Sequence, residues 1–214
     1  MSLTRNFITM TRLIEIYKSL SFLFTQIKLT ILCIEECIKN HSELSKIKFD
    51  DNFYNRPGFS MSSRAILSNH CLIQFKSFLD EYKNFNESNF DEKYSESIRR
   101  VRNLNQYGIK RINKWKDLEK FRNDILAHNF KANKKSFFNN PNNEIYEYLI
   151  PDSLNEKKVC LMIMQKICLN IMNEFPEVIT HSNIIHYNIG MNLKINFDNK
   201  LDLEEETRLI NENM

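Results

Sequence analysis

Residues that form turns are scarce in this chain. Its 214 residues include 3 glycines and 4 prolines, so few positions can interrupt a long regular segment. This composition favours an all-α protein, and the length fits one domain, or one domain with an appendage, with a real hydrophobic core. Three glycines also make a glycine-rich phosphate-binding loop hard to build, and no internal repeat is evident.

Long uncharged apolar runs are also lacking. The N-terminal region is rich in Leu, Ile and Phe, yet charged residues from Arg12 to Glu36 interrupt it far short of the roughly 20 apolar residues that a membrane span needs. No small-residue cleavage site follows a short apolar core. These absences predict a cytoplasmic protein that does not engage a membrane.

Neither cysteine usage nor net charge points to a specific ligand. Five cysteines form an odd set without the close Cys and His pairs that zinc sites use. We therefore expect buried thiols and no metal, although Cys33 and Cys37, one turn apart, would need only partners elsewhere in the fold to hold one. The formal net charge of +3 is too small to indicate a nucleic-acid binder by itself.

Apolar residues recur at three- and four-residue steps through the first two thirds of the chain. The steps predict helices over 4–41, either continuous or broken near Ser19, over 60–85, and over 92–105 with an end near Gly108. A further helix is predicted to bury one stripe of side chains. Its members are Ile112, Trp115, Leu118, Phe121 and Ile125.

The next helix has the clearest start. Ser153 and Glu156 match a capping box, in which the serine hydroxyl and the glutamate carboxylate bond two free amide groups of the first turn. An apolar run follows, and Pro176 closes it. We expect the side chains of this run to lie in the core of a bundle of four to five main amphipathic helices.

The pattern changes after residue 187. Apolar residues alternate with Asn, Gly and Lys from Ile189 to Phe197, the period of a strand, which would pair with 201–203 or with another chain. The acidic end, 202–213, is expected to be a solvated tail or a short helix. We therefore divide the chain into a helical bundle domain, 1–187, and a short β-like C-terminal extension, 188–214.

The most specific motif lies in the stretch 121–129, FRNDILAHN. Arg122, Asn123 and His128 supply a cation, an amide and a proton-transfer group, which suit the cleavage of a phosphodiester without a metal. In one regular helix Arg122 and His128 would lie about 9 Å apart along the axis and about 120° apart around it. A two-fold axis would bring the Arg of one subunit near the His of the other, so the motif predicts a composite site in a homodimer.

This arrangement resembles the HEPN superfamily, which is marked by an Arg, usually followed by Asn, Asp or His, and then a His four to six residues further on. The flanking WKDLEKFRNDILAHN is similar to HEPN domains of abortive-infection proteins in phage defence. The resemblance implies a dimeric, metal-independent endoribonuclease of a toxin or defence system, with no cofactor. His128 would be its general acid and base, Arg122 would bind the phosphate, and Asn123 would position groups in the pocket.

The resemblance also implies which partners the protein has. RNA would be the substrate, and an antitoxin or another defence protein would be a further partner. Some HEPN toxins are controlled by nucleotide modification of a Tyr two residues after the His. Phe130 stands at that position here, so this form of control is not expected.

Structural roles are the alternatives for the residues of the motif. Arg122 would pair with Glu119 on the surface, His128 would bond the last carbonyls of the helix, and Asn123 would bond backbone. The alternative function is a noncatalytic helical module that binds RNA or a partner protein.

Basic residues flank the motif on both sides. Lys131, Lys134 and Lys135 follow it and are candidate RNA contacts, and a basic run from Arg99 to Lys116 precedes it. Phosphate binding and a solvated helix face explain the preceding run equally well.

Overall fold

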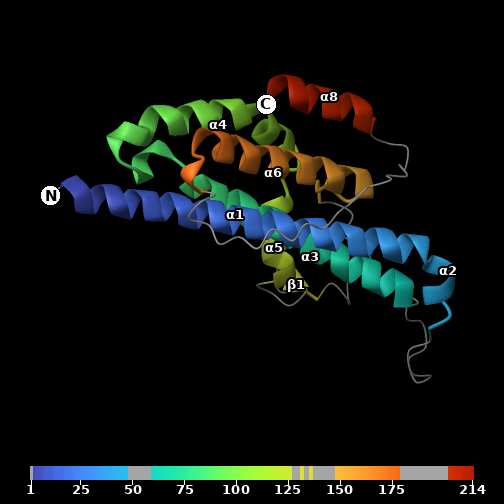
Figure 1. Ribbon diagram of the computed structural model, residues 1–214. Coiled ribbons are helices and arrows are strands. Elements are labelled where there is room, and N and C mark those ends of the chain that lie inside the picture. Colours follow the sequence, from blue (N-terminus) through green and yellow to red (C-terminus); the bar gives the residue numbers. More distant parts are fainter. Residues whose placement is uncertain (1, 48–58, 127–130, 133–134, 137–147, 179–201) are drawn as a thin grey trace.

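Helices form almost all of the regular structure in the computed structural model, which describes residues 2–47, 59–126, 131–132, 135–136, 148–178 and 202–214 (Figure 1). The main helices are α1 (Ser2–Lys39), α3 (Phe59–Asn84), α4 (Glu92–Ile112), α5 (Leu118–Leu126), α6 (Leu154–Glu174) and α8 (Leu203–Asn213). The short elements are α2 (His41–Leu44), the 3-10 helix η1 (Glu87–Asn89), and the antiparallel two-residue strands β1 (Lys131–Ala132) and β2 (Lys135–Ser136). The predicted all-α class is confirmed.

Helix α6 is the centre of the bundle, where it packs against α1, α3, α4 and α8 (Figure 1). It is apolar on most of its faces, and such a helix is stable only when other helices cover it. The predicted capping box is present: Ser153 Oγ accepts from the Glu156 amide at 3.2 Å, and Glu156 Oε2 accepts from the Ser153 amide at 3.1 Å. The helix ends just before Pro176, as predicted.

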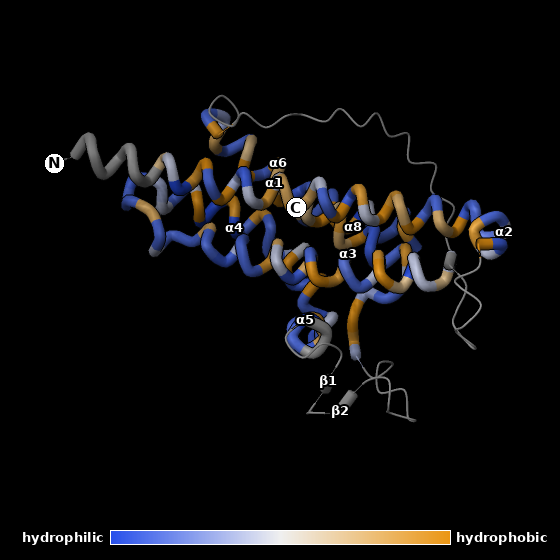
Figure 2. Tube along the Cα trace, turned by 90° about the horizontal axis from the view of Figure 1, so that it is seen from below, coloured by the Kyte–Doolittle hydropathy of each residue, from blue (hydrophilic) through white to orange (hydrophobic). Residues whose placement is uncertain are grey.

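Helices α1 and α3 form a long antiparallel hairpin (Figure 1). Helix α1 runs through Ser19 without a break, so the continuous form of the prediction is correct. Hydrophobic and hydrophilic residues alternate along the helices, as amphipathic packing requires (Figure 2). Leu20, Ile27, Phe75 and Phe78 are fully buried between the helices.

The helix predicted to carry the stripe from Ile112 to Ile125 is in fact the end of α4, a turn and the separate helix α5. The predicted stripe is buried through Phe121, but the chain bends within it, since the Trp115 amide bonds the Ile112 carbonyl at 3.0 Å in a tight turn. Asp117 then leads the chain toward Leu149: its amide donates to the Leu149 carbonyl at 3.2 Å, and its carboxylate accepts from the Leu149 amide at 2.8 Å. The sequence pattern therefore predicted the burial of the first four stripe residues correctly and the helix boundaries wrongly, and the side chain of Ile125 lies outside the described residues.

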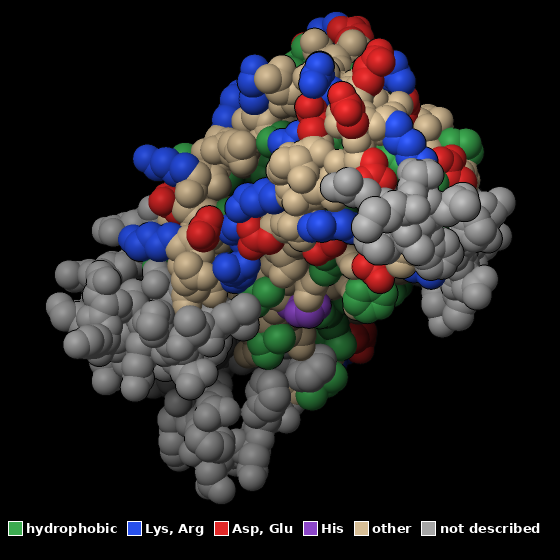
Figure 3. Space-filling view, turned by 90° about the vertical axis from the view of Figure 1, so that its left-hand side faces the viewer, with side chains coloured by type: hydrophobic (Ala, Val, Ile, Leu, Met, Phe, Trp, Pro, Cys, Tyr) green, Lys and Arg blue, Asp and Glu red, His purple; other side chains and the backbone are tan. Residues whose placement is uncertain are grey.

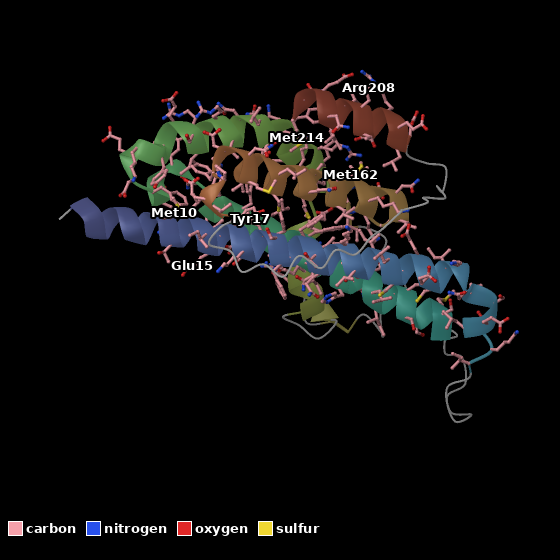
Figure 4. The ribbon with its side chains drawn as sticks, viewed as in Figure 1. Met10, Glu15, Tyr17, Met162, Arg208 and Met214 are labelled. Atoms are coloured by element: carbon pink, nitrogen blue, oxygen red, sulfur yellow. The ribbon has the colours of Figure 1, made fainter. Side chains whose placement is uncertain are left out.

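Gly108 does not end α4, which continues to Ile112. A Cβ atom at this position would lie 2.4 Å from Met214 Sδ and 2.6 Å from Ile163 Cγ2. The glycine therefore serves close packing against α6 and Met214, which lies where α4, α6 and α8 meet (Figure 4). The Met214 carbonyl also accepts a hydrogen bond of 3.2 Å from the buried Asn170 amide.

The acidic C-terminal segment is a helix. Asp202 accepts from the Glu204 and Glu205 amides at 3.1 Å, so its carboxylate caps α8. Leu203 therefore begins a helix and does not pair as a strand, which corrects that part of the prediction. The predicted strand Ile189–Phe197 lies outside the described residues. Leu203, Ile210 and Met214 are buried in the same hydrophobic cluster as α6.

The cysteines fall into two groups. Cys71, Cys160 and Cys168 are buried, and burial raises the pKa of each thiol, to about 12 for Cys71 and Cys168. Cys33 is exposed and Cys37 is half-buried on α1, so the expectation of buried thiols is wrong for Cys33. The reason is that the buried face of α1 passes through Ile31 and Ile34 instead.

Candidate functional site

Helix α5 presents the motif and is held firmly at its start. The bonds between Asp117 and Leu149 fix the first turn, and Phe121 packs edge-on against Tyr148 with ring centroids 5.5 Å apart. Leu118 and Phe121 are buried, which directs the next residue, Arg122, toward α3. The burial of these two side chains thus places the guanidinium.

Arg122 joins a group of charged side chains that we call the Asp80 cluster. Its members are Lys76, Asp80 and Lys83 of α3 and Glu119 and Arg122 of α5. Arg122 Nη1 donates to Asp80 Oδ2 at 2.6 Å, and Lys83 Nζ donates to Asp80 Oδ1 at 2.9 Å. Lys76 bonds the same Asp80 oxygen and lies 3.2 Å from Glu119 Oε2.

The partner of Arg122 differs from the one expected in a purely structural role. The sequence suggested Glu119, three residues earlier, but Glu119 pairs with Lys76 and Arg122 pairs with Asp80. The side chain of Arg122 is 28 % exposed, so the guanidinium is both bonded and open to solvent. A phosphate group would therefore have to share this guanidinium with Asp80 or displace the carboxylate from it.

Asp80 keeps its charge over the physiological pH range. Burial acts to raise its pKa, but hydrogen bonds and positive charge from Lys76 and Lys83 outweigh burial and lower the pKa from 3.8 to about 2. Acidification to any ordinary cellular pH consequently leaves the Arg122–Asp80 ion pair intact. Competition by another anion, such as a phosphate group, would free the guanidinium at these pH values.

We expect Asp80→Asn to lower the free energy of unfolding by about 1–3 kcal/mol near neutral pH, because it leaves the buried Lys76 charge with one partner fewer. The folded-state pKa of Asp80 lies below its unfolded value of 3.8, so its contribution is complete above pH 3.8 and is lost as the pH falls through about 2. Urea unfolding of both proteins across this range measures the difference.

The control for this prediction is Glu81→Gln, which removes a neighbouring carboxylate outside the cluster and should change stability by less than about 0.5 kcal/mol. A wild-type advantage over Asp80→Asn that stayed constant down to pH 2 would contradict the assigned role of the Asp80 carboxylate.

Asn123 is exposed and lies beside the guanidinium. Its Oδ1 accepts from Arg122 Nε at 3.4 Å and from Arg122 Nη2 at 3.3 Å. These contacts are long, so Asn123 steadies the Arg122 side chain weakly and leaves its own amide group accessible. The structure thus places two of the three motif residues side by side on the surface of α5.

A pocket of about 290 Å³ adjoins the Asp80 cluster, and we call it the α3–α5 pocket. Its lining comes from α3, the end of α4, the following turn and the start of α5. The lining residues are Lys76, Leu79, Lys83, Ile112, Asn113, Trp115, Lys116, Leu118 and Glu119. Three of them also belong to the Asp80 cluster, so the pocket and the motif arginine are linked through one carboxylate.

Of the other predicted site residues, the structure describes Lys131 and Lys135 by their backbone. His128 and Lys134 lie outside the described residues. Lys131 is in β1 and Lys135 is in β2, where the backbone pairs Lys131 with Ser136 and Ala132 with Lys135. The chain after the motif therefore contains a short antiparallel pair.

Three arginines of the basic run before the motif form ion pairs within the fold and a fourth bonds a backbone carbonyl, and positive and negative side chains are interspersed over the face in Figure 3. The pairs are Arg99 with Glu87 (2.8 Å), Arg100 with Glu174 (2.5 Å), Arg102 with the Phe85 carbonyl (2.7 Å) and Arg111 with Glu206 (3.1 Å). These contacts favour the structural interpretation for the arginines of the run. Lys116, at its end, lines the α3–α5 pocket.

Sequence reasoning missed the α3 half of the site. Lys76, Asp80 and Lys83 stand at helical i, i+4 and i, i+3 spacings, which predict ion pairs along one face of α3. That spacing was the available signal. It does not reveal that an arginine 42 residues further along the chain completes the cluster.

Among the described residues, no group of three or more His, Cys, Asp or Glu side chains lies close enough to hold a metal ion. Each described helix is too short or too polar to cross a bilayer. No protein-family model, curated protein or solved structure matches the chain. The candidate site accordingly consists of the motif, the Asp80 cluster and the α3–α5 pocket.

Proposed function

We propose that the protein is a metal-independent endoribonuclease of the HEPN type that acts as a homodimer in the cytoplasm, in a toxin or phage-defence system. The observation that carries the proposal is the motif Arg122, Asn123 and His128, whose arginine lies on a partly exposed surface beside a lysine-lined pocket. A guanidinium in this setting suits the binding of a phosphate group.

The reaction follows from the chemistry of the motif. The ribose 2′-oxygen attacks the adjacent phosphorus, the bond from phosphorus to the 5′-oxygen breaks, and the products end in a 2′,3′-cyclic phosphate and a 5′-hydroxyl. His128 moves the proton, accepting it from the 2′-hydroxyl or donating it to the leaving oxygen. Arg122 stabilises the negative charge that gathers on the phosphate oxygens, and Asn123 orients the strand.

Helix geometry is a further argument for a dimer. If the helix of the motif continued regularly past Leu126, Arg122 and His128 would lie too far apart around it to meet on one phosphate, and an isologous dimer would bring the Arg of one subunit near the His of the other. Lys131, Lys134 and Lys135 follow the motif and would contact the flanking phosphates.

The test is cleavage of single-stranded RNA by the purified protein in EDTA, at a stated salt concentration because phosphate contacts weaken with salt. We expect cleavage with 2′,3′-cyclic phosphate ends, and we expect His128→Ala to reduce it by about 10²–10⁴-fold, the usual contribution of a general acid or base. Cleavage by His128→Ala at the wild-type rate would reject this site.

A second candidate function is a noncatalytic module that binds RNA or a partner protein. The observation that favours it is the ion pair between Arg122 and Asp80, since it gives Arg122 a structural role that needs no substrate. This candidate predicts RNA or protein binding without turnover. The same assay separates the two functions.

A further inference from the structure

The α3–α5 pocket combines two kinds of wall. Leu79 contributes half-buried apolar surface, and Ile112, Trp115 and Leu118 are almost fully buried in the wall. Lys76, Lys83 and Lys116 contribute positive charge. A pocket with apolar walls and a few placed polar groups is the usual form of a small-molecule site, and about 290 Å³ lies at the small end of that class.

The charges around the pocket do not cancel. Lys76, Lys83, Lys116 and Arg122 face two carboxylates, those of Asp80 and Glu119, so four cations meet two anions and an excess of two positive charges remains. Lys116 is exposed and makes no ion pair with any residue that the structure describes. The site is therefore suited to an anion.

We infer that the α3–α5 pocket binds one nucleotide unit, its phosphate held by Lys83 and Lys116 and its base set against Leu79. Asn113 and Glu119 supply donors and acceptors for the edge of the base. This inference rests on the proposed function, because it assigns the nucleotide to the RNA strand that passes Arg122.

The apolar wall is the reason for choosing a nucleotide over a simple anion. Inorganic phosphate would use the lysines and leave the half-buried side chain of Leu79 in contact with water, whereas a base would cover it. The shared Asp80 carboxylate places the pocket next to Arg122. A nucleotide in the pocket would therefore neighbour the bond that is cut, which favours a strand over a free nucleotide.

Trp115 makes this inference directly testable, because it is the chain's one tryptophan and lies in the pocket wall. Tryptophan fluorescence of the full-length protein is followed during titration with a nucleoside 5′-monophosphate, the matching nucleoside and inorganic phosphate. Excitation at the red edge of the tryptophan band avoids absorption by the bases. We expect a saturable change with the monophosphate at lower concentration than with either fragment.

The test variant is Lys116→Glu, which changes an exposed lysine that lines the pocket. Its matched control is Lys114→Glu, which makes the same charge change on an exposed lysine of the same turn. We expect Lys116→Glu to weaken monophosphate binding by about tenfold, as for the loss of a charge-assisted hydrogen bond, and Lys114→Glu by less than about twofold. Equal weakening by both variants would show attraction to general surface charge and overturn the inference.

Other outcomes of these titrations also test the nucleotide site. Phosphate binding as tight as that of the monophosphate, or no saturable fluorescence change, would overturn the nucleotide site. With His128→Ala protein, tighter binding of an RNA trinucleotide than of the monophosphate would support a strand nucleotide, and the reverse order a free nucleotide. If the wild-type protein binds the monophosphate but does not cleave RNA, the proposed reaction is refuted and the nucleotide site is kept. If it cleaves RNA, does not bind the monophosphate and is unaffected by Lys116→Glu, the nucleotide site is refuted and the proposed reaction is kept.

Discussion

We expect a mixture of Arg122→Ala protein and His128→Ala protein to cleave RNA, although each variant alone should be nearly inactive. In a composite dimer site, a heterodimer of the two variants has one site that lacks both groups and one site that keeps both. Random pairing of equal amounts makes half of the dimers mixed, so we expect about a quarter of the wild-type rate. Each variant alone should lose about 10²–10⁴-fold.

The measurement is the initial rate of cleavage in EDTA at constant total subunit concentration, after time for the dimers to exchange. The control is His70→Ala, which removes an exposed histidine of α3 and should leave the rate unchanged. A mixture no more active than the separate variants, with exchange shown independently, would place Arg122 and His128 in the same subunit's site. Full activity of either variant alone would show that the residue replaced in that variant takes no part in the reaction.

Replacing Glu35 by Ala should destabilise the protein by about 3–5 kcal/mol, the usual cost of removing one partner of a buried ion pair. Glu35 of α1 pairs with Lys158 of α6, whose side chain is only 5 % exposed. Without the carboxylate, the Lys158 ammonium would stay in the core with one charged partner fewer. Urea unfolding at neutral pH measures the loss.

Two further variants serve as controls for this prediction. Glu36→Ala removes the neighbouring carboxylate, which pairs with Lys39 in solvent, and should cost at most about 1 kcal/mol. The double variant Glu35→Leu with Lys158→Met replaces both charges by apolar groups and should recover most of the stability lost by Glu35→Ala. A loss from Glu35→Ala no larger than that from Glu36→Ala would show that the Glu35–Lys158 pair contributes little.

Local sequence signals predicted the parts of the fold that depend on neighbouring residues. The capping box at Ser153 and the apolar run after it predicted α6, because both act within a few turns of one helix. The boundary between α4 and α5 could not be predicted in this way. It depends on the bonds of Asp117 with Leu149, which is 32 residues away in sequence, and these bonds override a continuous helical pattern.

In the candidate site too, contacts between sequence neighbours could be predicted and contacts between distant residues could not. Arg122 and Asn123 are adjacent in sequence, and their contact follows from the helix itself. Asp80 reaches Arg122 only because α5 packs against α3, so a single sequence offers no direct sign of that ion pair. Gly108 is a similar case, because the sequence suggested a helix end whereas the structure shows close packing against Met214.

The cysteine distribution gives the native chain a ready position for a spectroscopic probe. Burial and a raised pKa protect Cys71, Cys160 and Cys168 from alkylating reagents, while Cys33 is open to them on α1. A Cys37→Ser protein would accept a spin label at Cys33 alone. The distance between two such labels, measured by pulsed electron paramagnetic resonance, would then report how far apart the α1 helices of two associated subunits lie.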